Sequence, residues 1–187
     1  MKIINIHKNQ TTLINAATNN NRQAQHELYQ LYAPKMLSVC RMYIKDLQCA
    51  EEAMLNGFFK VFTHINEFKN QGSFEGWIRK IMVRESISFL RQKTNITFQD
   101  STFEDENEQP QFMQTKMDIE YIQNAIDTLP EGYKIIFVMY AIEGYKHHEI
   151  AKMLDINEGT SRSQLHKARK MLQEKLMQKN TTGYGTK

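Results

Sequence analysis

The chain has 187 residues, 41% of them hydrophobic, and this length suits one medium-sized domain or two small helical ones. Its formal net charge of +3 is small, so any affinity for nucleic acid has to depend on where the cations lie and not on their total. The only cysteines, Cys40 and Cys49, are too few for a secreted disulfide scaffold, and no stretch approaches ~18 consecutive apolar residues, so we expect a soluble cytoplasmic chain.

The first part of the chain is predicted to be helical. Apolar residues recur there at intervals of three and four, as in Leu28, Leu31 and Tyr32, which is typical of amphipathic helices. The spacing predicts helices near residues 22–32, 34–45, 48–66 and 73–93, with Pro34 at a helix start and Ser73 as an N-cap. The last of these helices follows the loop FKNQGSF and is basic, with Arg79, Lys80, Arg84, Arg91 and Lys93.

A composition change separates this part from the rest of the chain. From Thr94 to Thr115 the helical spacing is lost, and every charged residue is acidic. Such a segment predicts a flexible acidic linker. The expected fold is therefore all-α, with two small helical domains at residues 20–95 and 118–179 joined by a linker at 96–117.

The second part has the pattern of a helix-turn-helix. Leu129 and Pro130 begin a helix that is predicted to run to about Ile142, with Gly144 as its C-terminal cap. The next segment, HHEIAKMLDINEGTSRSQLHKARKML, has small and apolar residues at helix-turn-helix spacing: Ile150, Ala151, Leu154 and Ile156.

The last predicted helix is strongly basic. Thr160 or Ser161 is expected to cap it, and the span to Lys179 has Glu174 as its single acidic residue. Small polar residues at its start, Ser161, Ser163 and Gln164, would permit close approach to bases, and the cations farther along would contact phosphates. Its basic residues are Arg162, Lys167, Arg169, Lys170, Lys175 and Lys179.

Enzymatic motifs are not found. HHEIAK begins like the zinc-protease pattern H-E-x-x-H, but Lys152 stands where the second histidine is needed. There is no G-x-S-x-G, phosphate-binding loop or G-x-G-x-x-G motif in a strand-to-helix context. We therefore expect no catalytic residue, no metal and no cofactor.

Taken together, four segments resemble regions 2 and 4 of an extracytoplasmic-function (group 4) factor of the sigma-70 family. They are AQHELYQLYAPKMLSVCRMY, AEEAMLNGFFKVFTHINEF, GSFEGWIRKIMVRESISFLRQK and LPEGYKIIFVMYAIEGYKHHEIAKMLDINEGTSRSQLHKARKML. Each is weak alone, but their order and separation are specific. The resemblance implies a promoter-recognition subunit of bacterial RNA polymerase. Its implied partners are core polymerase, through the β′ clamp helices and β flap, promoter DNA and an anti-sigma factor, without membrane insertion.

The resemblance also implies three sets of contact residues. The face for core polymerase would comprise Glu51, Glu52, Asn56, Phe58 and Phe59. The −10 element, melted and held as a single strand, would contact Lys69, Asn70, Ser73, Phe74, Trp77, Arg79, Lys80 and Arg84. The −35 element would contact Ser161, Arg162, Ser163, Gln164, His166 and Lys167.

The chain departs from the family pattern at several positions. Leu55 and Asn56 stand where glutamine and an acidic residue are usual, Ser88 where aspartate is frequent, and Arg84 where asparagine is frequent. Asp155 replaces the usual glycine of the turn, and aspartate tolerates the left-handed conformation better than most residues.

Two other functions compete with this interpretation. A stand-alone helix-turn-helix regulator would use only residues 145–179 and would bind duplex DNA without polymerase, as a dimer on two half-sites. A protein-interaction adaptor would show no salt-dependent binding to DNA at all.

Overall fold

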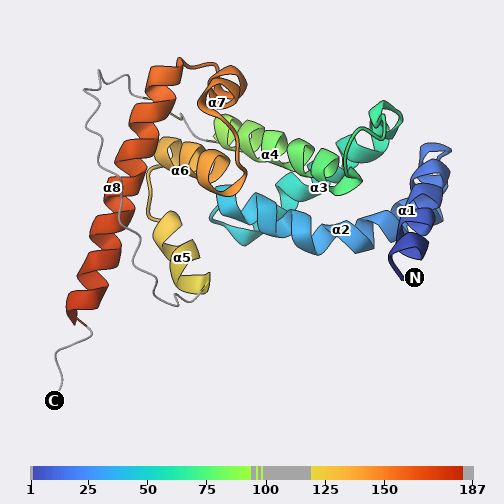
Figure 1. The fold of residues 1–187 in the computed structure, drawn as a ribbon, viewed down its shortest axis with the longest axis horizontal. Coiled ribbons are helices and arrows are strands. Elements are labelled where there is room, and N and C mark those ends of the chain that lie inside the picture. The colour runs from blue at the N-terminus through green and yellow to red at the C-terminus, as the bar shows by residue number, and fades with distance from the viewer. Residues whose placement is uncertain (1, 94–95, 97, 99–118, 183–187) are drawn as a thin grey trace. The chain divides into compact units, whose positions relative to one another are not determined.

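The computed structural model describes residues 2–93, 96, 98 and 119–182, and every regular element in these residues is a helix (Figure 1). The chain divides into two compact units, residues 1–94 and 95–187. The expected all-α class with two helical domains is confirmed. Apart from residues 96 and 98, the predicted linker lies outside the described residues. None of the helices in the described part is both long and apolar enough to cross a membrane.

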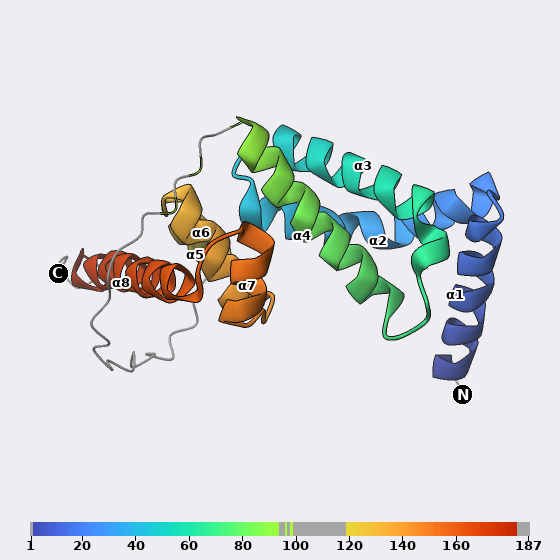
Figure 2. The ribbon, with the colours of Figure 1, turned by 90° about the horizontal axis from the view of Figure 1, so that it is seen from above.

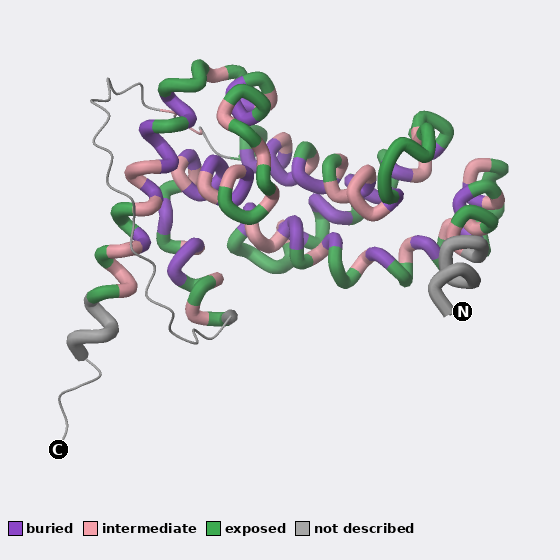
Figure 3. Tube along the Cα trace, viewed as in Figure 1, coloured by how far each residue is buried: buried purple, intermediate pink, exposed green. Residues whose placement is uncertain are grey.

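The first unit is a bundle of α2 (Arg22–Tyr43), α3 (Leu47–Thr63) and α4 (Phe74–Lys93), each of which packs on the other two (Figure 2). A further helix, α1 (Lys2–Thr18), packs on α2 and on the short 3₁₀ helix η1 (Ile65–Glu67). Buried residues recur along each of these helices (Figure 3). The helix α1 was not predicted, although Ile14 and Ala17 are buried three residues apart.

The helix α2 corrects the prediction of two helices that meet at Pro34. Pro34 lies inside α2, which runs unbroken from Arg22 to Tyr43. A proline inside a helix removes one backbone hydrogen bond. Here the apolar stripe continues across it, because Leu28, Tyr32 and Met36 are all buried on one side. Tertiary packing along this stripe offsets the local cost.

Short polar side chains act as N-caps of α2, α3 and α4. Ser73 Oγ accepts a hydrogen bond of 3.0 Å from the backbone N–H of Gly76, which confirms Ser73 as the predicted cap of α4. Asn21 and Asp46 accept in the same way from Ala24 and Cys49. These caps define where the chain enters each helix.

The second unit contains α5 (Ile119–Ile126), α6 (Glu131–Phe137), the π-helical turn η2 (Val138–Ile142), α7 (His147–Leu154) and α8 (Glu158–Thr182). Gly144 follows η2 with φ of 77°, in agreement with the predicted glycine cap. Ala125, Leu129, Ala168 and Leu172 form a core between α5 and α8.

A buried ion pair connects the start of α6 to the segment before it. Lys134 Nζ lies 2.6 Å from Asp127 Oδ1, and each side chain is only 4% exposed. A buried charge without its partner is strongly destabilising. Each residue of this pair therefore requires the other in the folded state.

The turn between α7 and α8 has the predicted left-handed residue. Asp155 adopts φ of 56° and ψ of 52° and ends α7. The predicted cap of α8 is wrong by one turn: Asn157 Oδ1 accepts a hydrogen bond from the backbone N–H of Thr160, and α8 begins at Glu158. Thr160 and Ser161 are therefore buried residues of the first turn of α8.

Candidate nucleic-acid interface

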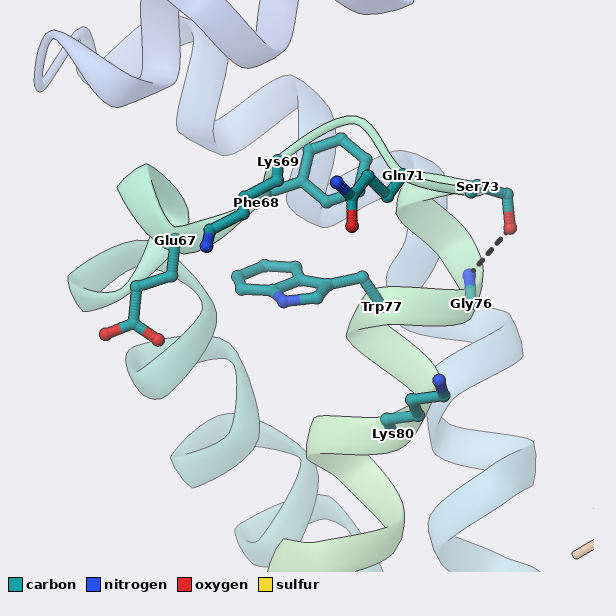
Figure 4. A pocket seen from close by; sticks show the side chains of 9 residues that line it. Glu67, Phe68, Lys69, Gln71, Ser73, Gly76, Trp77 and Lys80 are labelled. Carbon is teal, nitrogen blue, oxygen red and sulfur yellow. Dashed lines mark hydrogen bonds between the residues drawn. The ribbon is translucent and has the colours of Figure 1, made fainter.

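An open pocket of about 300 Å³ lies between the loop that follows η1 and the start of α4. Figure 4 shows the indole of Trp77 extending from α4 beneath this loop, towards the side chains of Phe68 and Lys69. The loop turns at Asn70 and Gly72, which have positive φ values of 56° and 106°. The pocket is lined by Glu67, Phe68, Lys69, Gln71, Gly72, Ser73, Gly76, Trp77 and Lys80.

An aromatic cluster supports the wall of this pocket. The Phe74 ring stacks on Trp77 with centroids 5.7 Å apart, and Phe68 packs edge-on against Phe74 at 5.0 Å. Trp77 is half-buried, whereas Phe74 is only 3% exposed and also contacts Tyr32. Phe74 is therefore a core residue that supports Trp77, and this burial favours an indirect role over the direct DNA contact that the resemblance implies.

One side of α4 continues from the pocket as a basic stripe. Trp77, Lys80 and Arg84 are spaced by three and four residues, so they share one side of the helix. Lys80 and Arg84 are exposed. Arg79 is half-buried and lies on a different side of α4. An aromatic pocket followed by cations suits a single strand, because bases stack on aromatic rings and cations neutralise phosphates.

Besides Trp77, three of the residues that the resemblance assigns to the −10 element line this pocket, and their contact with DNA stays a prediction. Lys69, Ser73 and Lys80 line the pocket, and Asn70 is exposed in the loop beside it. Glu67 and Gln71 also line the pocket but were not predicted as site residues. For Gln71, the position in a polar loop beside Gly72 was the available signal, because such a loop exposes its side chains; Glu67 is the last residue of η1.

A second surface lies on α3. Glu51, Glu52 and Asn56 are exposed there, and Phe59 is 71% exposed. Leu55, noted above as a departure from the family pattern, is 54% exposed and belongs to the same face. A helix face with exposed apolar side chains flanked by carboxylates suits a protein partner.

The prediction for Phe58 on this face is wrong. Phe58 is 3% exposed, and its ring meets Tyr29 edge-on at 4.9 Å and stacks with Phe62 at 6.0 Å. Adjacent residues on a helix point about 100° apart, so Phe58 and Phe59 can differ in exposure although they are neighbours. The structure places Phe59 outwards.

The helix-turn-helix of the second unit presents Arg162 to solvent. Its side chain is 63% exposed, and its Nη2 donates to Glu158 Oε2 at 3.2 Å, one turn earlier on α8. His166 and Lys167 are partly exposed on the following turn. These three predicted residues are accessible to a ligand.

The three small polar residues predicted to reach bases are buried instead. Ser161 and Ser163 are 0% exposed and Gln164 is 1% exposed. Ser163 Oγ donates to the backbone oxygen of Thr160. Because α8 begins at Glu158, Ser161 and Gln164 share the inward side of the helix with Leu165 and Ala168. The side chains of Ser161, Ser163 and Gln164 therefore do not lie on the exposed side of α8 with Arg162.

A cluster that the sequence did not indicate supports the start of α8. His147 Nδ1 and Ser161 Oγ share a hydrogen bond of 2.9 Å. The imidazole stacks on the ring of Tyr140 with centroids 4.6 Å apart. The guanidinium of Arg169 lies over the same Tyr140 ring, 5.5 Å from its centroid. Burial lowers the pKa of His147, and the nearby Arg162 and Arg169 lower it further while Glu158 opposes them.

Within the described side chains no group of three or more histidine, cysteine and acidic residues could hold a metal ion. The first unit has an open pocket with an aromatic wall and nearby cations, and the second has an exposed arginine on a helix-turn-helix.

Comparison with family models identifies both units. A model described as Sigma-70 region 2 matches residues 28–96, and a model described as Sigma-70, region 4 matches residues 119–172. The first match covers α2 to α4 with the pocket, and the second covers α5 to most of α8.

Two curated relatives resemble most of the chain. The ECF RNA polymerase sigma factor SigE of Mycolicibacterium smegmatis is 25% identical over 157 residues, which are 80% of this chain and 60% of that protein. The chain thus spans less than two thirds of this relative. RNA polymerase sigma factor SigV of Bacillus subtilis is 27% identical over 138 residues, 72% of this chain and 80% of that protein.

A solved structure shares the fold. The sigma factor RpoE of Bartonella quintana, in complex with the anti-sigma factor NepR, aligns with a TM-score of 0.55 and 18% identity over 81% of this chain and 96% of that one.

Proposed function

Because this chain belongs to the extracytoplasmic-function group of the sigma-70 family, we propose that it directs core RNA polymerase to promoters by binding the −35 element and by melting and holding the −10 element. Members of this family are regulators of transcription initiation and not enzymes. The observation that carries the proposal is the pair of family matches, one on each unit and in the order region 2, region 4.

The two units divide the work in this proposal. Residues 20–95 form the region that binds core polymerase and the −10 element, residues 118–179 bind the −35 element, and residues 96–117 connect them. The protein acts in the cytoplasm, where polymerase and chromosome are. This division is supported by the pocket on one unit and the helix-turn-helix on the other.

In the first unit, a base of the opened −10 strand enters the pocket beneath the loop and stacks against Trp77, while Lys80 and Arg84 bind the phosphates beside it. Stacking of one base on an aromatic side chain contributes about 1–3 kcal/mol. Phe74 supports the indole from behind, at a ring distance of 5.7 Å. Melting is thus stabilised by trapped bases and phosphate contacts, without a nucleotide cofactor.

In the second unit, Arg162 enters the major groove of the −35 element, and His166 and Lys167 contact the same site from the next turn. An exposed arginine can bond both acceptors of a guanine edge, which contributes about 1–3 kcal/mol of discrimination. The exposure of Arg162 supports its place at the centre of this contact.

Core polymerase is proposed to bind the exposed face of α3, formed by Glu51, Glu52, Leu55, Asn56 and Phe59. The β′ clamp helices are the expected partner there, and the β flap is the expected partner of the second unit. An anti-sigma factor is proposed as the regulator, in line with the complex in which the RpoE of Bartonella quintana was solved.

Two measurements test the proposed function. The full chain should pull down bacterial core polymerase, and the reconstituted holoenzyme should enrich a duplex from a library with randomised −35 and −10 segments and start run-off transcription on it. Failure to bind core and to start transcription on any duplex would reject the proposal. Footprints on duplex DNA by the chain alone, as a dimer, would favour the stand-alone regulator instead.

The variant Arg162→Ala tests the −35 assignment. It should lower the preference for the enriched −35 sequence by about 1–3 kcal/mol without abolishing core binding. Arg22→Ala, which removes an exposed arginine of α2, is the matched control and should retain the preference. An unchanged preference in Arg162→Ala would remove this residue from the base-reading set.

A further inference from the structure

An acidic side chain lines the pocket that is proposed to hold a base of the −10 strand. The carboxylate of Glu67 can only accept hydrogen bonds, whereas the amino groups of Lys69 and Lys80, which also line the pocket, can only donate them. Figure 4 shows Glu67 on the η1 side of the indole of Trp77 and Lys80 on the α4 side. The phosphates of a strand repel a carboxylate, so Glu67 needs a partner of another kind in the complex.

Packed neighbours hold the backbone of Glu67 beside the aromatic wall. Glu67 is the last residue of η1, and its backbone N–H donates to the backbone oxygen of His64 at 2.9 Å. Ile65, at the start of η1, is 3% exposed, and the ring of Phe68 lies 5.7 Å from that of Trp77. Anchored residues thus precede and follow Glu67, which limits how far its side chain can move from the indole.

The Glu67 side chain is itself exposed and available to a ligand. Its carboxylate makes no hydrogen bond or ion pair with any residue that the structure describes. In an open pocket such a carboxylate is hydrated. A base that stacks on Trp77 displaces part of this water, and the carboxylate then loses free energy unless the base supplies a donor.

The four bases differ in the donors that they offer. Cytosine, adenine and guanine each have an exocyclic amino group, whereas thymine has none. The ring N–H of thymine lies between two carbonyl oxygens, and a carboxylate repels both of them. Carboxylates of proteins accept hydrogen bonds from N4 of cytosine when they read DNA. A carboxylate beside the stacked base therefore favours an amino-bearing base over thymine.

Resting on the proposed function, in which a −10 base enters this pocket, we propose that Glu67 determines which base the pocket accepts. It accepts a hydrogen bond from the amino group of cytosine, adenine or guanine, and it disfavours thymine. One hydrogen bond between a base and a charged side chain changes the preference between bases by about tenfold. Lys80 and Arg84 remain the contacts to phosphate.

The test first identifies the base that enters the pocket. Holoenzyme reconstituted from core polymerase and the full chain binds a fork of the enriched promoter in which the −10 non-template strand is single, and the dissociation constant is measured by fluorescence anisotropy. An abasic site is placed at each −10 position in turn. At the captured position, loss of the base should weaken binding by the wild type about tenfold, and binding by Trp77→Ala much less.

The captured position is then filled with each of the four bases and with purine, which is adenine without its amino group. The wild type should bind each amino-bearing base about tenfold more tightly than thymine, and it should bind purine about as weakly as thymine. Glu67→Gln should reduce both ratios to within about twofold, because the glutamine amide can donate to a carbonyl as well as accept from an amino group.

Glu75→Gln is the matched control. Glu75 belongs to the first turn of α4, but its carboxylate pairs with Lys35 at 2.9 Å and does not line the pocket. Each substitution removes one negative charge and so strengthens the binding of all bases alike. The ratio between bases, and not the affinity itself, therefore reports recognition by Glu67. Glu75→Gln should retain the wild-type ratio.

Three results would overturn the inference: equal binding of thymine and the amino-bearing bases by the wild type, an unchanged ratio in Glu67→Gln, or an equal loss of the ratio in Glu75→Gln. A −10 strand in which no position depends on Trp77 would also overturn it, because no base then enters the pocket. If the holoenzyme still starts transcription in these cases, only this inference fails. Failure to bind core polymerase and to start transcription rejects the proposed function itself.

Discussion

Asp155 is one of three non-glycine residues with positive φ in the described part of the chain, together with Asn20 and Asn70. It has φ of 56° in the turn between α7 and α8. A residue with a Cβ atom is disfavoured in this left-handed region, and aspartate less so than most. The turn of the helix-turn-helix is therefore formed at a cost that a glycine would not incur.

Asp155→Gly should stabilise the second unit by up to about 1 kcal/mol, because glycine removes the left-handed penalty but loses more entropy on folding. Asp155→Ala should destabilise it, since alanine bears the penalty without the local hydrogen bonding of aspartate. Thermal unfolding monitored by circular dichroism measures both. A less stable glycine variant would show that the aspartate side chain stabilises the turn.

The two cysteines differ in burial, and their reactivity should differ accordingly. Cys40 is 0% exposed, and burial raises its pKa to about 11. Cys49 is half-buried near the start of α3, 3.4 Å from Lys93 Nζ. The thiolate is the reactive form of a cysteine. Iodoacetamide at pH 8 should therefore modify Cys49 in the native chain and both cysteines only after denaturation, as measured by mass spectrometry. Modification of Cys40 in the native chain would contradict the packing of α2.

At the scale of elements, Gly57 allows α3 to approach α4. A Cβ atom on Gly57 would collide with Sδ of Met82 and would lie 2.9 Å from its Cε, and Met82 is 0% exposed. The end of the Met82 side chain would therefore have to shift within the buried core to admit a methyl group. This close approach keeps the basic side of α4 in place on the bundle.

Gly57→Ala should destabilise the first unit by about 1–3 kcal/mol, despite the better helix propensity of alanine. Adding Met82→Ala should recover part of this loss, because the smaller side chain makes room for the new methyl group. Urea unfolding of both single variants and the double variant gives the coupling energy. Strictly additive changes in the free energy of unfolding would indicate that the new methyl group does not clash with Met82.

Apolar spacing was sufficient to predict the helical class, because α3 and α4 alternate buried and exposed residues with the helical period. It failed at Pro34, where a strong local signal for a helix start was overridden by a continuous buried stripe in α2. It also misplaced the start of α8, since Asn157, Thr160 and Ser161 are all acceptable caps and only the folded turn selects Asn157.

The sequence predicted the kinds of surface on each unit better than it predicted which individual side chains are exposed on them. A family motif indicates a segment, but the side of the helix decides between neighbours, so Phe59 is exposed and Phe58 is buried. Trp77 and Phe74 stack on each other, but only Trp77 lines the pocket, because Phe74 is buried against Tyr32 and Phe68. The contacts of His147 with Tyr140 and Ser161 join residues from different elements, and sequence spacing does not show such contacts.

At the scale of the whole molecule, the proposed function requires that the two units bind one promoter together. Each unit has a compact set of internal contacts and its own surface cations. Counterion release then makes holoenzyme affinity depend on salt, with a contribution from each phosphate-bound cation. The slope of log affinity against log salt concentration therefore reports how many cations of the protein contact DNA phosphates.

Lys80→Ala should reduce the slope of log affinity against log salt concentration by about 0.7, the value for one phosphate contact on a single strand. Lys45→Ala, which removes an exposed lysine between α2 and α3, is the control and should leave the slope unchanged. Promoter binding by each holoenzyme is measured between 50 and 200 mM salt. Equal slopes for the wild type and Lys80→Ala would place Lys80 outside the strand path.

Arg162 is already paired when DNA arrives, because Glu158 accepts its hydrogen bond one turn earlier on α8. A DNA phosphate and the Glu158 carboxylate are similar hydrogen-bond acceptors for the guanidinium, so exchanging one for the other gains little. A guanine edge has two coplanar acceptors that the guanidinium can bond at once. If Arg162 reads the −35 element as proposed, the carboxylate of Glu158 competes with DNA phosphates for its guanidinium. This competition would weaken contacts that do not depend on base sequence more than the contact with a matching guanine.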